Sequence, residues 1–300
     1  KKTFLLFVTL VIVHCSLKIE DCRSQWVVQN SGITANLYDV KFINRNTGWA
    51  CGENGILLKT TDCGNNWINI QNPTSGMGKI LNKVFIVDTS VIYFIGAHST
   101  YIKTTNGGAN WIIIRNGPWG SGMGFLGLFF LNKDTGWVCG NARVLRTTDG
   151  GSSFDSTGGL NDYDMEDIYF KDFENGLICG DGTVIKTTDG GMNWFNTNVP
   201  TGGHYYPFAK LTVRNNQYVW IAGGSSPVYH SANFGSTWDS IGAINSYPPS
   251  VMYCVSFASM FTGFAGGTYG YLYKTTDGGH IWNKQNTGTD QRFWGAMYCY

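Results

Sequence analysis

The sequence carries little charge, and its charged residues form no run of one sign. They make up 14% of the chain, and the formal net charge at pH 7 is +1. Proteins that bind a nucleic-acid backbone use clustered lysine and arginine side chains. We therefore expect no nucleic-acid partner. Acidic tails and low-complexity tracts are absent too, while the 43% of hydrophobic residues is enough for a sizeable core.

Long apolar runs are equally scarce. The one that exists, FLLFVTLVIV, follows Lys1 and Lys2 and is too short to span a bilayer. A basic start followed by such a run is typical of a secretory signal peptide. We predict that residues 1–24 are a signal peptide and that residues 25–300 are exported to a periplasmic, cell-surface or extracellular location, with no transmembrane segment in the mature chain. A lipid-modified Cys15 is the alternative, which the preceding His14 fits poorly.

Glycine is abundant, with 40 residues, and one short segment returns along the chain. It reads KTTDCGNNW in its first copy and KTTDGGHIW in its last. The copies end at Trp67, Trp111, Phe154, Trp194, Trp238 and Trp282, so successive copies lie 40–44 residues apart. A fixed period of this length indicates a repeat architecture.

Each repeat contains four short strand patterns. In the first they are VKFIN, GWACG, ILLKTT and WINI, separated by turns such as NRNT and ENG. Alternating apolar and polar residues predict half-buried strands, and four of them in about 40–45 residues are typical of one propeller blade. The fold class is therefore all-β, a β-propeller of four-stranded antiparallel blades.

The two ends of the sequence bear on the number of blades. The segment from Gln25 to Asn30 resembles an outer strand without a blade of its own, and RFWGAMYCY near the end resembles the first strand of a further blade. We predict seven blades, with the last shared between the two ends and incomplete in this sequence. A six-bladed ring is the alternative.

The repeated segment has a structural explanation. Its aspartate or asparagine can accept backbone hydrogen bonds within a turn, its second glycine allows positive φ, and its aromatic residue can wedge between adjacent blades. The predicted structural residues are Asp62, Gly64 and Trp67; Asn106, Gly108 and Trp111; Asp149, Gly151 and Phe154; Asp189, Gly191 and Trp194; Asn233, Gly235 and Trp238; and Asp277, Gly279 and Trp282.

These six copies resemble the Asp box, or bacterial neuraminidase repeat. The fuller pattern TGWACGENGILLKTTDCGNNW is also similar to photosystem II stability and assembly factor-like propellers, over residues 26–300. That resemblance implies a non-enzymatic scaffold that binds protein partners. The Asp box also occurs in sialidases and other glycosidases, so a carbohydrate-active protein, either a glycan-binding module or a glycoside hydrolase, is the alternative.

Motifs for catalysis are missing from the sequence. The F/Y-R-I-P motif of sialidases has no counterpart, and there is no metal-binding cluster, nucleophile elbow or phosphate-binding loop. We therefore predict no catalytic residue, no cofactor and no metal site.

A ligand is expected at the axial opening of the face opposite the boxes, where aromatic and acidic residues of turns and blade connections gather. The expected ligand is a protein or a glycan, bound by a monomer. The candidate residues are Glu53, His98, Trp119, Arg143, Tyr163, Asp164, Asp167, Asp181, His204, Tyr205, Tyr269, Arg292 and Trp294.

Three of the eight cysteines occupy one position of the repeat, directly before a glycine. Ile95 and Ala222 fill that position in other copies. A position that accepts cysteine, isoleucine and alanine is a small buried apolar site. We predict buried free thiols at Cys51, Cys139 and Cys179. The cysteines whose pairing the sequence leaves open are Cys22, Cys254 and Cys299.

Overall fold

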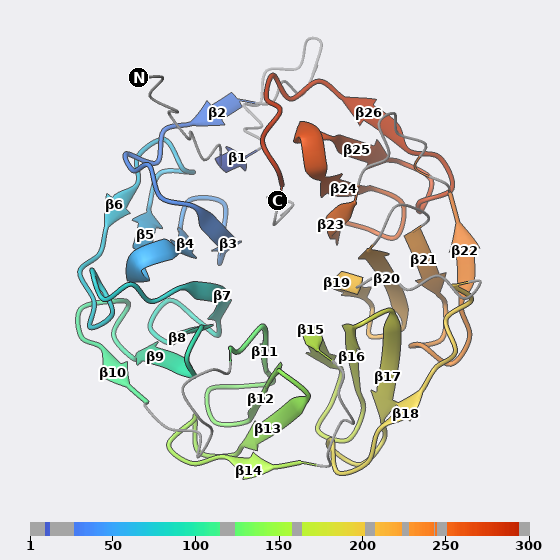
Figure 1. Cartoon of the computed structure of the whole chain (residues 1–300), viewed down its shortest axis with the longest axis horizontal. Coiled ribbons are helices and arrows are strands. Elements are labelled where there is room, and N and C mark those ends of the chain that lie inside the picture. The colour runs from blue at the N-terminus through green and yellow to red at the C-terminus, as the bar shows by residue number, and fades with distance from the viewer. Residues whose placement is uncertain are drawn as a thin grey trace.

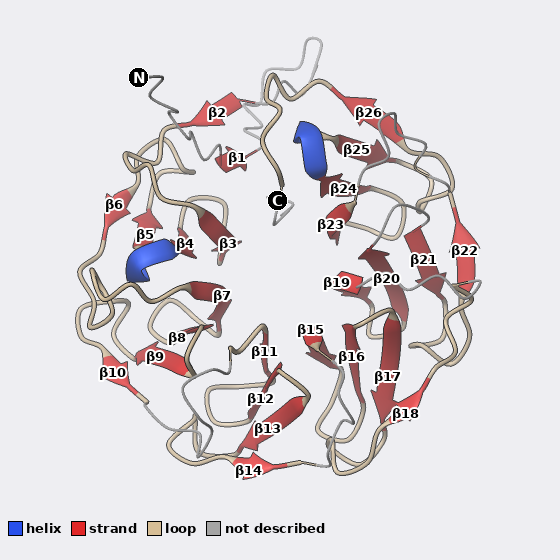
Figure 2. Cartoon of the chain, in the orientation of Figure 1, coloured by secondary structure: helices blue, strands red, loops and turns tan. Residues whose placement is uncertain are grey.

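The computed structural model of the chain describes residues 10–12, 27–114, 124–157, 164–201, 208–223, 228–242, 244 and 251–293. Six four-stranded antiparallel sheets stand around a central axis as the blades of a propeller (Figures 1 and 2). Within each blade the strands follow one another from the axis outward. Within these ranges no helix combines the length and apolar character needed to cross a bilayer.

The blades are numbered in chain order. Blade 1 contains β3 (Leu37–Phe42), β4 (Gly48–Gly52), β5 (Leu57–Thr60) and β6 (Ile68–Asn69); blade 2 contains β7 (Leu81–Ile86), β8 (Ile92–Gly96), β9 (Thr100–Thr104) and β10 (Ile112–Ile113); blade 3 contains β11 (Gly127–Phe130), β12 (Gly136–Gly140), β13 (Arg143–Thr147) and β14 (Asp155–Ser156). Blade 4 contains β15 (Met165–Phe170), β16 (Gly176–Gly180), β17 (Thr183–Thr187) and β18 (Phe195–Asn196); blade 5 contains β19 (Phe208–Arg214), β20 (Tyr218–Gly223), β21 (Val228–Ser231) and β22 (Asp239–Ile241); blade 6 contains β23 (Met252–Phe257), β24 (Gly263–Gly267), β25 (Leu272–Thr275) and β26 (Asn283–Gln285). Short 3-10 turns, η1 (Glu53–Gly55) and η2 (Thr268–Gly270), join the second and third strands of blades 1 and 6.

The number of complete blades matches the six-bladed alternative. The described residues do not form the seventh blade of our main expectation; beside the six blades they contain only a two-stranded sheet, β1 (Leu10–Ile12) paired with β2 (Val27–Gln29). Figure 1 places this sheet in the sector between blade 6 and blade 1. The strand β2 lies within the segment predicted as an outer strand. It pairs with residues of the predicted signal peptide, because the described chain contains no further blade strand in that sector.

The chain leaves blade 6 along the path used between complete blades. The Phe293 amide donates to the Gly267 carbonyl at 3.0 Å, just as the Phe125 amide donates to the Gly96 carbonyl at 3.1 Å before the inner strand of blade 3. Residues 294–300, which include most of the predicted additional inner strand, lie outside the described residues. Blade 6 is therefore left through the same backbone contact that precedes the inner strand of blade 3.

Aromatic stacking between neighbouring blades forms the core. The second-strand residue Trp137 of blade 3 stacks on Phe170 of the blade 4 inner strand, with ring centroids 3.6 Å apart. The box residue Trp194 of blade 4 meets Phe170 edge-on at 6.0 Å. Trp220 and Phe257 repeat the stack between blades 5 and 6 at 4.0 Å, because the repeat places the same residue types at the same seam.

Each box forms the same network of hydrogen bonds. In blade 4 the Asp189 Oδ1 atom accepts from the Thr187 hydroxyl at 2.8 Å and the Asn193 amide at 2.9 Å, while the Gly191 amide donates to the Thr187 hydroxyl at 2.9 Å. Asn106 accepts the corresponding bonds in blade 2 through its own Oδ1 atom. One acceptor oxygen is therefore what this turn requires, and the negative charge is not.

The box turns also fasten neighbouring blades together. The Trp137 indole N–H of blade 3 donates to the carbonyl of Gly190 in the blade 4 box at 3.0 Å. The Lys59 ammonium of blade 1 donates in the same way to the Gly107 carbonyl of the blade 2 box at 2.9 Å. The basic residue that opens a box is thus paired locally at the seam.

The second strand ends in a glycine because neighbouring backbone atoms leave no room for a Cβ atom at that position. A Cβ atom at Gly52 would overlap the Asn36 carbonyl, and one at Gly96 would overlap the Ile80 carbonyl. The turn beyond this glycine consequently sits directly against the start of the inner strand. The residue before it is small and buried: Cys51, Cys139 and Cys179 are buried free thiols.

We predict that Asp149→Ala lowers the free energy of unfolding by about 1–2 kcal/mol, because the Ser153 amide and the Thr147 hydroxyl lose their acceptor. Asp149→Asn keeps an Oδ1 acceptor, as Asn106 does in blade 2, and should retain most of the stability. Guanidinium-induced unfolding of both variants measures the difference.

The pKa of Asp149 predicts how the free energy of unfolding changes at acidic pH. The Ser153 hydroxyl and amide lower the pKa of Asp149 to about 2, below the unfolded value of about 3.9. The part of its contribution that depends on ionisation is therefore present above pH about 4 and is lost as the pH falls toward about 2. Equal losses for the alanine and asparagine variants at neutral pH would contradict the acceptor role.

Candidate functional site

One residue from each inner strand lies at an equivalent position around the propeller axis. Each is paired with the residue before the terminal glycine of the second strand; for example, Asp39 pairs with Cys51 and Lys83 with Ile95. In all blades but the third, the pairing register shifts directly before this residue. In blade order the six positions are Asp39, Lys83, Gly127, Asp167, Lys210 and Cys254. We call this set the axial ring.

Asp167 is the electrostatic centre of the axial ring. Its Oδ1 atom lies 3.6 Å from the Lys83 ammonium of blade 2, and its Oδ2 atom lies 3.8 Å from the Lys210 ammonium of blade 5. The same Oδ2 atom accepts the Leu211 amide at 3.2 Å. Asp39 forms the equivalent bond to the Val84 amide at 3.1 Å. Both aspartates thus tie one inner strand to the next.

The two lysines share one carboxylate and titrate differently. Burial opposes the charge on Lys83, but the Asp167 and Asp39 carboxylates outweigh it and raise the pKa of Lys83. Burial lowers the pKa of Lys210 to about 8, since the Lys83 ammonium adds repulsion to the desolvation. Burial also opposes the charge on Asp167, yet the two ammonium groups hold its pKa below the usual value.

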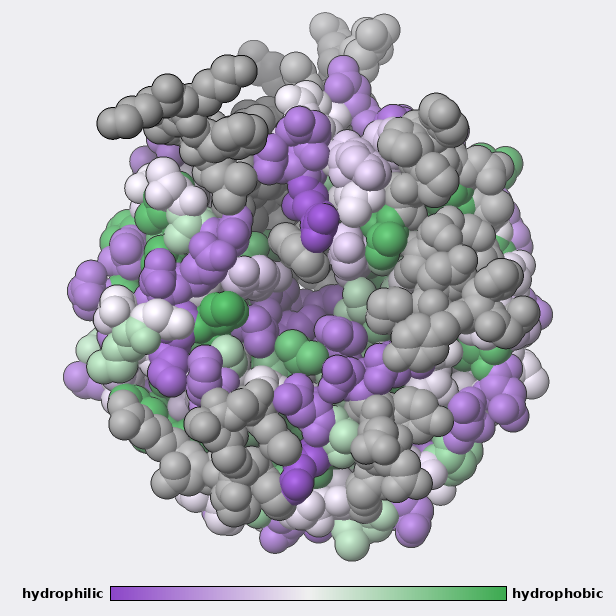
Figure 3. All heavy atoms as spheres, viewed as in Figure 1, coloured by the Kyte–Doolittle hydropathy of each residue, from purple (hydrophilic) through white to green (hydrophobic). Residues whose placement is uncertain are grey.

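A cavity of about 290 Å³ lies at the axis, lined by inner strands of blades 1 to 5. Beyond the charged residues, Phe85, Phe129 and Tyr169 follow two positions later on their strands and therefore on the same side. The Phe85 and Phe129 centroids are 5.5 Å apart, and those of Phe129 and Tyr169 are 4.8 Å apart. The cavity thus has a charged layer and, next to it, a layer in which these three rings lie beside Lys41 and Thr212. Figure 3, which has the same view as Figure 1, shows a hollow at the centre of the ring with hydrophilic residues in it.

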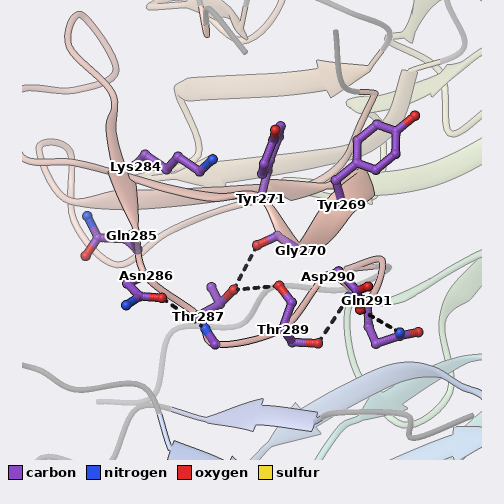
Figure 4. A pocket seen from close by; sticks show the side chains of 11 residues that line it. Tyr269, Gly270, Tyr271, Lys284, Gln285, Asn286, Thr287, Thr289, Asp290 and Gln291 are labelled. Carbon is purple, nitrogen blue, oxygen red and sulfur yellow. Dashed lines mark hydrogen bonds between the residues drawn. The ribbon is translucent and has the colours of Figure 1, made fainter. Parts of the chain in front are cut away.

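A second, larger hollow of about 870 Å³ lies at the edge of blade 6, and we call it the blade 6 cleft (Figure 4). Its residues come from η2, from Tyr271 just before β25, from β26 and from the segment that follows β26. The Lys284 ammonium stands 3.7 Å from the centroid of the Tyr271 ring. The Thr287 hydroxyl, 2.9 Å from the Gly270 carbonyl, holds the following segment against η2. The other polar lining residues are Gln285, Asn286, Thr289, Asp290 and Gln291.

Tyr269 occupies an unusual backbone position in this cleft. Its φ is +57°, in the left-handed region, and its side chain is 54% exposed. The equivalent residue in η1 is Asn54, with φ +55°, and asparagine tolerates this conformation better than a tyrosine does. The turn therefore holds a bulky aromatic residue in a strained conformation and presents it to solvent, a combination that is concentrated at functional sites.

The structure separates the predicted ligand residues into groups. Glu53, His98, Asp181 and Tyr269 lie in turns between second and third strands, and Arg143 begins β13 just after such a turn. Glu53 accepts the Asn36 amide and side chain, at 3.1 and 2.7 Å. These hydrogen bonds lower its pKa. The predicted residues outside the described part of the chain are Trp119, Tyr163, His204, Tyr205 and Trp294.

The remaining predicted residues lie elsewhere. Asp167 is buried in the axial ring instead of lying in an exposed blade connection. Exposed Asp164 donates its amide to the Asp181 carboxylate at 2.6 Å. Arg292 stands over the Tyr253 ring at 5.4 Å. No group of three or more His, Cys, Asp or Glu within the described ranges could hold a metal ion.

Sequence reasoning missed the lysines of the axial ring. Lys83 and Lys210 each follow the strand start by two residues, in the register where blades 1 and 4 have aspartate. The signal was available in the repeat, because aligning the inner strands brings Asp39, Lys83, Asp167 and Lys210 into one column. A charge recurring at a single repeat position, close to the axis, would have identified the site.

Comparison with known proteins gives one family match. The family model described as photosynthesis system II assembly factor YCF48 matches residues 19–123 and 159–289, more than half of the chain. A search of curated proteins found no match.

Solved structures share the fold. A structure of YCF48 bound to a D1 peptide has a TM-score of 0.68 and 19% identity, covering 84% of this chain and 81% of its own. YCF48 from Cyanidioschyzon merolae has a TM-score of 0.67 and 17% identity, over 85% of this chain and 86% of its own. The GH74 xyloglucanase from Xanthomonas campestris has a TM-score of 0.67 and 12% identity, over 84% of this chain and 45% of its own. At these identities the likeness establishes the fold alone.

We predict that Asp167→Asn lowers the free energy of unfolding by about 3–5 kcal/mol, because two largely buried ammonium groups lose their shared counter-charge. Asp164→Asn, three residues earlier and exposed, is the matched control and should change stability by less than about 0.5 kcal/mol. Urea-induced unfolding checks both values. Similar losses in the two variants would show that Asp167 does not carry the axial ion pairs.

Proposed function

The chain belongs to the family of the photosynthesis system II assembly factor YCF48, and on that premise we propose that it is a non-enzymatic scaffold that binds an extended segment of a partner protein. The observation that carries this proposal is the blade 6 cleft, with its exposed, strained Tyr269 beside a run of amide and hydroxyl side chains. The solved YCF48 structure with a D1 peptide supports a protein segment as the ligand.

The chemistry of the cleft suits a peptide backbone. Amide side chains such as Gln285, Asn286 and Gln291 both donate and accept hydrogen bonds, as a peptide group does. A tyrosine supplies a large contact area for little lost side-chain entropy, which is why tyrosine beside asparagine and serine is common in protein-binding surfaces. A volume of about 870 Å³ falls within the range of ligand sites and can hold several side chains.

The acidic residues support a non-enzymatic role. Glycoside hydrolysis needs a protonated acid and a second carboxylate facing the substrate. Asp167 is held ionised between two lysines, which makes it a poor acid. Asp181 accepts the backbone amide of Asp164. Burial raises the pKa of Glu166, which leaves this residue as the group to test for acid catalysis.

Glycan binding is the second candidate function. A tyrosine ring at the surface beside amide side chains also suits a sugar, whose ring stacks on the aromatic face while its hydroxyls bond to the amides. The exposed ring of Tyr269 is the observation that favours it. The fold shared with a GH74 xyloglucanase adds no residue-level support at 12% identity.

We also propose export of the protein. The basic start and apolar run within residues 1–24 motivate this proposal. Expression of the full chain in a secreting host followed by N-terminal sequencing tests it. A mature N-terminus near residue 25 is expected, and recovery of an uncleaved cytoplasmic product would overturn it.

We predict that Tyr269→Ala weakens binding of a synthetic D1 peptide by about tenfold or more, since a central exposed aromatic anchor is removed. Phe261→Ala is the matched control, because Phe261 is 64% exposed but lies in the opposite-face turn of the same blade. It should leave the affinity unchanged. Fluorescence anisotropy with a labelled peptide measures both.

A glycan array incubated with wild type and Tyr269→Ala distinguishes the two candidates. Binding of a defined sugar that disappears with Tyr269→Ala, together with no measurable binding of the peptide, would replace the protein-binding proposal by the glycan one. Turnover of an aryl-glycoside that is abolished by Glu166→Gln would overturn the non-enzymatic role.

A further inference from the structure

The axial cavity contains more positive than negative charge. Three lysines line it, Lys41, Lys83 and Lys210, against two aspartates, Asp39 and Asp167. Glu166 acts on Lys83 through its charge but does not line the cavity. The side chains of Lys83 and Lys210 are only 17% and 13% exposed, so bulk water compensates little of their charge.

The ammonium groups of this cavity lack short hydrogen bonds. Lys83 and Lys210 are 3.6 and 3.8 Å from Asp167 oxygens, whereas charge-assisted hydrogen bonds are about 2.7–2.9 Å long. The two lysine amines interact with each other through a side-chain hydrogen bond, and within the described ranges neither of them donates a hydrogen bond to an oxygen atom. The Asp167 Oδ2 atom is already engaged by the Leu211 amide. Two cations thus converge on one carboxylate that satisfies neither fully.

A glycine lies between the blades of this ion pair. Gly127 is the blade 3 member of the axial ring, between Lys83 in blade 2 and Asp167 in blade 4. A Cβ atom at Gly127 would lie 3.2 Å from the Asp167 Cα atom, and it would collide with the Cys139 sulfur. Gly127 thus lets blade 3 pack closely against Ile168 and Asp167 of blade 4, and the Lys83 ammonium of blade 2 lies 3.6 Å from Asp167 beyond it.

We propose that the axial cavity binds a small oxyanion, a carboxylate or an inorganic anion of sulfate size, between the ammonium groups of Lys83 and Lys210. Such an anion offers several acceptor oxygens to the lysine donors and balances the excess positive charge. The volume of about 290 Å³ suits a small group. This inference does not rest on the blade 6 cleft.

Calorimetric titration of the full chain with sulfate and with acetate, at constant ionic strength in chloride, tests the proposal. Both anions should bind. Lys210→Met, or Lys210→Gln if the first variant does not fold, should weaken sulfate binding by about tenfold or more. Lys133→Met is the matched control, because Lys133 forms an exposed ion pair with Asp134 away from the axis, and it should leave the affinity unchanged.

Asp167→Asn should change the sulfate affinity in the opposite direction to Lys210→Met. It removes the carboxylate that competes with the ligand for the lysines, so sulfate should bind about tenfold more tightly and should restore part of the stability that this variant loses. A merely structural role for Asp167 predicts weaker binding instead. Failure of wild type to bind either anion, or equal affinities in wild type and Lys210→Met, would overturn the proposal.

The pH dependence gives a second readout. Sulfate affinity should be highest near pH 6 to 7 and fall as the pH rises through about 8, where Lys210 loses its proton. The groups that face Lys210 are Asp39 and Lys41 from β3, Lys83 from β7, Glu166 and Asp167 from β15, and Cys254 from β23. In Lys210→Met this fall should disappear, and a fall that persists there would contradict the assignment.

The oxyanion could be the C-terminal carboxylate of a peptide or a free inorganic anion. Two probes distinguish these sources: acetylated trialanine with a free C-terminal carboxylate, and the same peptide with a C-terminal amide. Competition of sulfate by the free acid, with no effect of the amide, would assign the site to a peptide carboxylate. Sulfate binding without competition by either peptide would assign it to a free inorganic anion. Both results are independent of Tyr269→Ala, so failure of the anion site and failure of the cleft proposal can be distinguished.

Discussion

The contact on which the ring depends is the packing of the second strand of one blade against the inner strand of the next. Trp137 on Phe170 and Trp220 on Phe257 bury large rings face to face across a seam. An isolated four-stranded sheet cannot bury both of its faces, so each blade is stable only against neighbours. The box aromatic closes the stack edge-on, and the box turn hydrogen-bonds across the same seam through its first glycine carbonyl.

Because the apolar packing lies between the blades, the positions that face the propeller axis can hold polar and charged side chains. The apolar side chains that stabilise the ring are packed at the seams between blades. The axis-facing positions of the inner strands can therefore hold charges, provided that the charges are paired or hydrogen-bonded. Asp39 and Asp167 are used twice, as acceptors for the next blade's backbone and as counter-charges for lysines. Stability and a charged cavity are thus built from the same two side chains.

Much of the fold could be read from the repeat. The box spacing predicts blades of four strands, and each of the six blades in the described ranges has four strands. The number of blades was predicted less well. The expected seventh blade depended on strands at the two ends of the sequence, and the described residues there form only the pair β1 and β2. The candidate site was predicted less well. The turn positions of Glu53, His98, Asp181 and Tyr269 followed from strand order, but Asp167 was expected in a loop and lies in the axial ring.

The sequence by itself determined the period, the strand order within a blade and the chemistry of the box, because these depend on residues close together in the chain. Only the tertiary structure decided that Lys83 of blade 2 and Lys210 of blade 5 meet at Asp167 of blade 4, past a glycine in blade 3. That meeting depends on the radius of the ring and the stagger of its inner strands, which no single repeat contains. The strained backbone at Tyr269 was hidden for a related reason. Its turn is held by contacts with the start of the inner strand and with the segment after β26, and neither is adjacent to it in sequence.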